Sequence, residues 1–206
     1  MNPKPVPCIV GPFPPAPRSN QLTGTLSPDF GAAWPRMEDL DLGVNGFAGP
    51  LPKEWAKMTN LKKLNINNNK LTGTLSPDFG AAWRAIEELL LIINGFTGPL
   101  PTEWAGMGKL RDLRLQSNQL TGTLSPNFGA AWPQMEDLDL GRNDFTGPLP
   151  KEWAKMTNLK MLILNANKLT GTLSPDLRAA WPAMKELRLD TNAFTGPLAT
   201  SLGSSG

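Results

Sequence analysis

Several residue types on which enzymes depend are scarce or missing in this sequence of 206 residues. It contains no histidine and no tyrosine, and its one cysteine is Cys8. Histidine is the commonest general base and the commonest metal ligand of proteins, so its absence argues against many active sites and metal sites. We also find no phosphate-binding loop, no cluster of metal ligands and no nucleophile with a neighbouring base. The sequence therefore predicts a protein without catalytic activity or cofactor.

Strong charge and long apolar runs are missing as well. The formal net charge is +2, which favours neither nucleic acid nor an anionic membrane as a partner. No stretch reaches the roughly 18 consecutive apolar residues that a membrane-spanning helix needs. The segment Met1 to Pro17 lacks the apolar stretch of a secretory signal. We expect neither nucleic-acid binding nor membrane insertion, and composition alone leaves the compartment open.

What the sequence does contain is an internal repeat. One asparagine recurs at intervals that alternate between 25 and 24 residues, so the full period is 49 residues. In each unit it ends the phrase (Leu/Met/Ile)-x-x-Leu-x-(Leu/Ile)-x-x-Asn, as in Met37 to Asn45. The Leu-x-Leu pair has period two, which predicts a short strand with both leucines on one face and the residue between them on the other. The asparagine is expected to turn the chain and to satisfy backbone groups of that turn. The eight asparagines are Asn20, Asn45, Asn69, Asn94, Asn118, Asn143, Asn167 and Asn192.

The second half of each unit predicts a bend and then a short helical turn. A glycine such as Gly73 recurs in Leu-Thr-Gly-Thr-Leu or Phe-Thr-Gly-Pro-Leu, where a side chain would hinder the bend. A proline follows at the place where a short α-helix or 3₁₀ turn would begin. Large apolar residues come next, three apart in one unit type (Trp55, Met58) and four apart in the other (Phe79, Trp83). Because the seven tryptophans recur in register with the leucines, we expect them in the core and not in contact with a sugar.

The phrase Leu-x-x-Leu-x-Leu-x-x-Asn-x-(Leu/Phe)-Thr-Gly-x-Leu-Pro resembles the plant-specific class of leucine-rich repeats, which includes receptor ectodomains and polygalacturonase inhibitors. The Trp-x-x-Met variant, as in Trp55 to Met58, is also similar to repeats in surface antigens of kinetoplastid parasites. This resemblance implies an α/β solenoid, a right-handed superhelix with a parallel β-sheet on its concave face. It also implies short second strands near the Thr-Gly motif and short helical or 3₁₀ turns on the convex side.

The repeat defines the expected domain boundaries. Residues 1–18 form a proline-rich lead or cap, residues 19–198 the repeat domain, and residues 199–206 a Ser/Gly tail. Cysteine-paired caps of the family cannot form with Cys8 alone, and the last unit stops after Leu198 without its tryptophan turn. We therefore expect a fragment or an end that self-associates. The resemblance implies an extracellular or cell-surface location.

Members of the family usually bind partners on the concave or lateral strand surface, so the outward strand positions are the candidate binding residues. Leu90, Ile92 and Ile93 form an apolar break in this mostly polar face, and Met161 and Ile163 form a second one about 15 Å away. Apolar patches of this kind are typical of contact sites. We predict a protein-binding face that comprises Asp41, Asn65, Leu90, Ile92, Ile93, Arg114, Asp139, Arg142, Met161, Ile163 and Arg188.

The chain also carries a near-copy of itself. Residues 37–83 match residues 135–181 at an offset of 98, and only nine of 47 positions differ. Four of the nine (Val44, Lys63, Asn65 and Asn68) are predicted outward strand positions, and in the second copy they become Arg142, Met161, Ile163 and Ala166. Drift at unconstrained positions and retuned binding both account for this pattern.

Two other functions stay open. Near-identical blocks would allow a structural role in which copies stack end to end. A threonine recurs once per unit in Thr23, Thr72, Thr97, Thr121, Thr146, Thr170 and Thr195, with Ala48 in the remaining place. A regular column of hydroxyl groups would fit an ice-binding protein.

Paired aspartates at positions 39 and 41, and again at 137 and 139, also lie at outward strand positions. Two carboxylates can serve a glycosidase or bind a cation. Because no other ligands converge on them, we expect solvated surface at both pairs.

Overall fold

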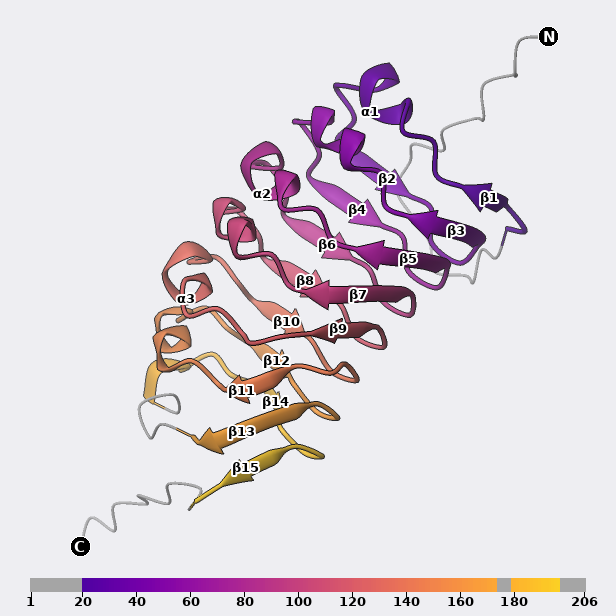
Figure 1. Ribbon diagram of the computed structural model, residues 1–206. Helices are drawn as coiled ribbons and strands as arrows, with labels where there is room; N and C mark the ends of the chain where they lie inside the picture. The colour runs from indigo at the N-terminus through magenta and orange to yellow at the C-terminus, as the bar shows by residue number, and fades with distance from the viewer. Residues whose placement is uncertain (1–19, 174–178, 197–206) are drawn as a thin grey trace, which may run out of the picture.

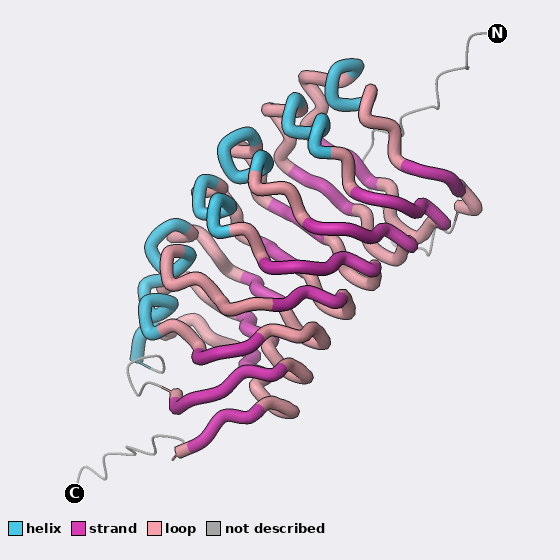
Figure 2. The backbone as a smooth tube through the Cα atoms, in the orientation of Figure 1, coloured by secondary structure: helices cyan, strands magenta, loops and turns pink. Residues whose placement is uncertain are grey.

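The computed structural model describes residues 20–173 and 179–196, which form a solenoid (Figure 1). Each repeat unit makes one rung, with a strand of a long sheet, a turn, a strand of a second sheet and a short helix. Figure 2 shows the helices along one side of the stack and the second strands along another. The predicted lead at 1–18, Cys8 within it and the predicted tail at 199–206 lie outside the described residues.

The long sheet has seven parallel strands, and neighbours in the sheet come from successive units. Its central leucines pair in register from Leu40 through to Leu187. The first six of these leucines are buried, while Leu187, in the last described strand, is 45% exposed. The predicted strands and their inward leucines are thus confirmed. The strands are β2 (Asp39–Asp41), β4 (Lys63–Asn65), β6 (Glu88–Leu90), β8 (Asp112–Arg114), β10 (Asp137–Asp139), β12 (Met161–Ile163) and β14 (Glu186–Arg188).

The asparagines from Asn45 to Asn192 tie each turn to the preceding unit, as the sequence predicts. The Asn118 amide Nδ2 donates to the Leu115 carbonyl within its own turn and to the Leu91 carbonyl of the preceding unit. Its Oδ1 accepts the Phe96 N–H at 3.1 Å. Buried backbone groups that would otherwise lack partners are satisfied in this way, which stabilises each rung against its neighbour.

After the turn, the chain enters the second sheets. These comprise a five-stranded and a three-stranded parallel sheet, joined by a bridge between Thr123 and Thr146. Gly73 and its equivalents have positive φ angles, +82° at Gly73, which confirms the predicted bend. The strands are β1 (Thr23–Thr25), β3 (Gly46–Pro50), β5 (Lys70–Thr74), β7 (Gly95–Pro99), β9 (Gln119–Thr121), β11 (Thr146–Pro148), β13 (Lys168–Thr172) and β15 (Ala193–Thr195).

Short helices close each rung, and the tryptophans lie beneath them. Trp55, Trp83 and their equivalents from Trp104 to Trp153 are fully buried, which confirms their predicted place in the core. The indoles from Trp55 to Trp181 also tie rungs together; Nε1 of Trp83, for example, donates to the Trp55 carbonyl at 3.1 Å. Within the described residues, no helix has the length and apolar character needed to cross a membrane. The helices are α1 (Phe30–Ala33), α2 (Asp78–Ala82) and α3 (Phe128–Ala131), with 3₁₀ helices η1 (Lys53–Lys57), η2 (Thr102–Gly106) and η3 (Lys151–Lys155).

Candidate functional site

The outward residues of the seven-stranded sheet form two straight columns, which together with the turn after each strand we call the strand face. The structure places the predicted central residues in one column, each paired in register with its neighbour. This central column is Asp41, Asn65, Leu90, Arg114, Asp139, Ile163 and Arg188. A parallel first column, two residues earlier in each strand, is Asp39, Lys63, Glu88, Asp112, Asp137, Met161 and Glu186.

Ile92, Ile93 and Arg142 do not continue these strands. The strands β6 and β10 end at Leu90 and Asp139, and the residues that follow belong to the turn. Extending the strand alternation into this turn was therefore wrong, because the backbone there adopts a left-handed conformation. The affected residues have φ between 52° and 58° and are Val44, Asn68, Ile93, Ser117, Arg142, Ala166 and Thr191.

Ile93 combines a left-handed backbone with an exposed apolar side chain. Its φ of 53° is unfavourable for a β-branched residue, and the left-handed conformation costs roughly 1–2 kcal/mol. Its side chain is also 49% exposed, so little packing within the chain offsets that cost. Val44 repeats the combination in an earlier unit, with φ 55° and 40% exposure. The strand face thus carries exposed apolar side chains at positions where backbone strain disfavours them.

The two predicted apolar clusters are both present and lie three strands apart. Leu90, half-buried on β6, continues toward Ile92 and Ile93 in the turn that follows. Half-buried Met161 and Ile163 lie on β12. The strands β8 and β10 separate the two clusters and carry charged side chains. The apolar surface is therefore divided by a charged strip.

Arg114 organises that strip. Its Nε donates to the Asp112 carboxylate at 2.8 Å, and its Nη2 donates to the Asp137 carboxylate at 3.2 Å. The hydrogen bond to Asp112 raises the pKa of Arg114. Burial raises the pKa of Asp112 in spite of that bond. Asp112 was not among the predicted binding residues, although its place two residues before Arg114 on the same strand was the available signal.

Asp139 contradicts the expectation of a solvated aspartate pair. It is only 3% exposed, whereas Asp41, at the equivalent position of the first copy, is exposed. Its carboxylate accepts the Gly141 N–H at 3.0 Å. Burial raises the pKa of Asp139, and the Gly141 bond and the Arg114 charge oppose that rise. The reason for the difference is position, because β8 and β12 flank Asp139 on both sides, while β2 is the first described strand of the sheet.

The threonines of the second sheets do not form the single column that an ice-binding surface would present. Equivalent residues of successive units are offset by two residues in the pairing, so Thr23 pairs with Gly46 and Thr25 pairs with Ala48. A lysine also enters the pattern, because Ala48 pairs onward with Lys70. Direct threonine neighbours occur only as pairs within the described strands, namely Thr74–Thr97, Thr123–Thr146 and Thr172–Thr195.

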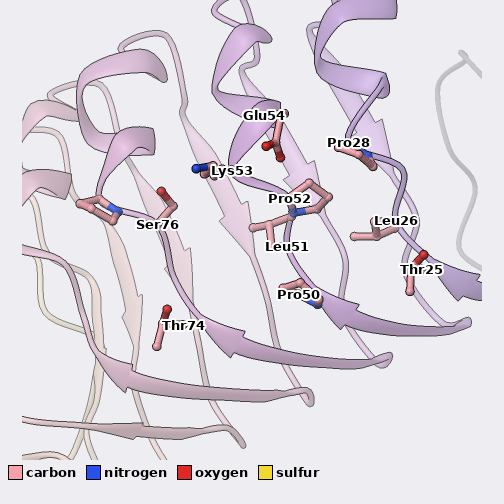
Figure 3. Close-up of a pocket in the computed structure, with 11 residues that line it drawn as sticks. Thr25, Leu26, Pro28, Pro50, Leu51, Pro52, Lys53, Glu54, Thr74 and Ser76 are labelled. Atoms are coloured by element: carbon pink, nitrogen blue, oxygen red, sulfur yellow. The ribbon is translucent and has the colours of Figure 1, made fainter.

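An open groove of about 600 Å³ lies on the side of the solenoid, beside the ends of β1, β3 and β5 (Figure 3). Proline rings and hydroxyl groups line it, including Pro50, Pro52 and Thr74, with the charged Lys53 and Glu54 at η1. This groove was not predicted from the sequence. Its prolines recur at the same positions in later units.

Comparison with protein families identifies the repeat. The family model described as leucine rich repeat matches residues 108–169, and a second leucine rich repeat model matches residues 60–82. No curated protein sequence is similar enough to count as a match.

Solved structures show the same architecture. The leucine-rich-repeat ectodomain of the receptor kinase GASSHO1/SCHENGEN3 from Arabidopsis thaliana, in complex with CASPARIAN STRIP INTEGRITY FACTOR 2, is 28% identical, with a TM-score of 0.83 over 87% of this chain. The ectodomain of the Arabidopsis receptor kinase HAESA, in complex with an IDA peptide hormone ligand, is 29% identical, with a TM-score of 0.81 over 86% of this chain. A leucine-rich-repeat protein of Leptospira interrogans is 34% identical, with a TM-score of 0.68 over 86% of this chain.

This chain is much shorter than these neighbours. It spans 21% of the GASSHO1/SCHENGEN3 chain, 29% of the HAESA chain and 43% of the bacterial one. Residues 60–82 and 108–169 thus match leucine rich repeat models, and the solenoid is similar in structure to plant leucine-rich-repeat receptor ectodomains.

Proposed function

We propose that this chain is a non-enzymatic protein-binding module, and that its strand face, the concave face of the family, binds an extended segment of a partner protein. The exposed, left-handed Ile93 carries the proposal. Its side chain makes the apolar surface of the face larger at a cost in backbone energy, and an exposed apolar group of this kind is stabilised when a partner covers it.

The solved neighbours support a peptide or protein as the partner. The HAESA ectodomain was solved with a peptide hormone ligand, and the GASSHO1/SCHENGEN3 ectodomain was solved with CASPARIAN STRIP INTEGRITY FACTOR 2. Both are similar to this chain in fold, with TM-scores of 0.81 and 0.83. By that likeness the partner is a peptide or protein, and the location is extracellular or at the cell surface.

Selection of random twelve-residue peptides displayed on phage against the immobilised chain tests the proposal. Enriched peptides are then measured against two variants by fluorescence anisotropy. The strand-face variant Leu90→Asp/Ile93→Asp places charges in the apolar cluster, and we expect it to weaken binding by about tenfold or more. The control variant Lys57→Glu changes the charge of η1 on the helical side, and we expect binding to stay within about twofold.

Urea unfolding of both variants checks that the solenoid is intact. The proposal fails if the enriched peptides bind the strand-face variant as tightly as the unmodified chain. It also fails if the Lys57→Glu variant alone loses binding.

A further inference from the structure

One column of the strand face repeats on every second rung. Its members are the left-handed turn residues, which we call the turn column: Val44, Asn68, Ile93, Ser117, Arg142, Ala166 and Thr191. Backbone hydrogen bonds join successive turns, as from the Ile93 N–H to the Gln116 carbonyl, and hold the column in register. The 49-residue period places Val44, Ile93 and Arg142 on alternate rungs, with smaller polar residues on the rungs between them.

Two of these three residues are exposed apolar side chains. Val44 and Ile93 share this property, among large side chains of the described residues, only with Leu22 and Leu187. Leu22 lies just before β1 and Leu187 on β14, at the two ends of the described stack. Between those ends, the exposed large apolar side chains are thus confined to the turn column. Both are β-branched and left-handed, and backbone strain of this kind is typical of binding sites.

The third residue is a cation that a partner can reach. Arg142 is exposed, and it takes part in no ion pair within residues 20–173 and 179–196. The nearest carboxylate along the chain, that of Asp144, is held by Lys168 at 2.7 Å. Arg114, in contrast, is already bonded to two aspartates. A carboxylate of the partner would be complementary to Arg142.

The spacing of the three residues selects a conformation for the partner. Neighbouring parallel strands lie about 4.8 Å apart, so alternate rungs are about 9.6 Å apart. A polyproline II helix has three residues per turn and rises about 3.1 Å per residue, so its residues i, i+3 and i+6 lie on one side at intervals of about 9.3 Å. The side chains on one face of a β-strand recur at about 6.6 Å or 13 Å and do not match alternate rungs.

Backbone hydrogen bonding favours the same conformation. The N–H groups of Val44, Ile93 and Arg142 already donate to carbonyls of the next rung, at 2.8, 3.0 and 2.8 Å. They are therefore not available to an added β-strand. A polyproline II helix makes no internal hydrogen bonds and keeps its backbone solvated, so it can bind this column through side chains alone.

Building on the proposed function, we propose that the partner segment is a polyproline II helix that lies along the turn column and has the pattern apolar–x–x–apolar–x–x–(Asp or Glu). Its apolar side chains contact Val44 and Ile93, and its carboxylate pairs with Arg142. The pattern applies in either chain direction, because the spacing of side chains is the same both ways. The apolar contacts supply most of the affinity, and the ion pair supplies the discrimination between peptides.

Synthetic peptides test the pattern with the full chain, by fluorescence anisotropy at low salt. The two matching peptides are Leu-Pro-Pro-Leu-Pro-Pro-Glu and its reverse, Glu-Pro-Pro-Leu-Pro-Pro-Leu. Each has two controls, one with Lys in place of Glu and one with the central Leu moved by one place to another side of the helix. We expect at least one matching peptide to bind about tenfold or more tightly than both of its controls.

The internal duplication provides a matched protein variant. Arg142→Val introduces the residue found 98 positions earlier, at Val44, where φ is 55° against 52° at Arg142, so the turn is expected to be kept. We expect the Glu-to-Lys preference to fall to within about twofold. The control variant Arg84→Val removes an exposed cation just beyond the end of α2 and should keep the preference.

The variant Ile93→Gly separates binding from stability. Glycine adopts a positive φ without strain but lacks the apolar side chain. We expect the affinity for the matching peptide to fall about tenfold with no fall in the midpoint of urea unfolding. A fall in that midpoint would assign Ile93 a structural role and contradict the proposal.

The inference is overturned if the Glu and Lys peptides bind equally, if neither matching peptide binds, or if the preference survives in Arg142→Val. Phage-selected peptides separate this failure from that of the proposed function. Selected peptides that need the strand face but bind Arg142→Val or Ile93→Gly as tightly as the unmodified chain would overturn only the inference. Selected peptides that do not need the strand face would overturn both.

Discussion

Asp41 and Asp139 stand in nearly identical sequence, Asp-Leu-Asp-Leu-Gly, 98 residues apart, yet their surroundings differ. Asp41 lies on the first described strand of the sheet and is exposed. Asp139 lies between β8 and β12 and is almost fully covered, next to Arg114 on one side and Ile163 on the other. The ionised form of Asp139 is disfavoured by that burial, which raises its pKa above the usual value of 3.8.

Replacement Asp139→Asn is expected to stabilise the chain at neutral pH. Since the pKa of Asp139 is higher in the folded chain, the folded state binds the proton more tightly, and the free energy of unfolding falls as pH rises from about 3.8 through the folded pKa. At pH values above the folded pKa, the buried carboxylate is ionised and the full loss in the free energy of unfolding is present. Asparagine avoids the cost and keeps an oxygen that accepts the Gly141 N–H. Urea unfolding between pH 3 and pH 8 should show a gain in the variant that grows with pH and then levels off.

Asp41→Asn is the matched control, because it changes the same residue in the same local sequence at an exposed position. Its unfolding curve should follow that of the unmodified chain within about 0.5 kcal/mol at every pH. A loss of stability in Asp139→Asn at neutral pH would show that the Asp139 carboxylate is a net stabilising group, contrary to the present interpretation.

At the scale of the element, the short α-helices and 3₁₀ helices depend on a close approach that only glycine allows. A Cβ added at Gly129 in α3 would lie 2.0 Å from the backbone carbonyl oxygen of Glu152 in η3, and Gly80 has the same relation to Glu103. Backbone atoms cannot move aside as a flexible side chain can. The distance between neighbouring rungs on the helical side is therefore set by these glycines.

Gly129→Ala should consequently destabilise the chain by about 2 kcal/mol or more, because the new methyl group forces α3 and η3 apart. Gly108→Ala serves as its control, since a Cβ at Gly108 would meet the Ala131 carbonyl oxygen at an ordinary 3.8 Å. The control should change the free energy of unfolding by less than about 0.5 kcal/mol in urea. Equal effects of the two substitutions would refute the role assigned to the close approach.

Most elements could be predicted from the sequence, because their signals lie within one unit. The leucine spacing locates the strand, the asparagine locates the turn, and the tryptophan spacing locates the buried side of the helix. Prediction failed where the answer depends on another unit. The burial of Asp139 is decided by residues on β8 and β12, and the pairing of Thr25 with Ala48 by an offset between units. The position of Ile93 was missed for a local reason, because the alternation of a strand stops where φ becomes positive.

At the scale of the whole molecule, the strand face is a product of stacking. Its two columns are drawn from residues 39–188. The ion pairs Lys63–Glu88 and Arg188–Glu186 lie on either side of the charged strip on β8 and β10. Each rung contributes only two outward strand residues and a turn, so no single unit can form the apolar–charged–apolar order. A partner that recognises this order must cross several rungs.

Photo-crosslinking tests this account most directly. A phage-selected peptide is synthesised with a benzophenone side chain at one apolar position, irradiated with the full chain, and the attachment site is located by mass spectrometry. The account predicts crosslinks on β6 or β12 and the turns that follow them, at residues such as Leu90, Ile93 and Met161. Crosslinks concentrated on the second sheets or on the helical side would contradict the claim that the strand face binds the partner.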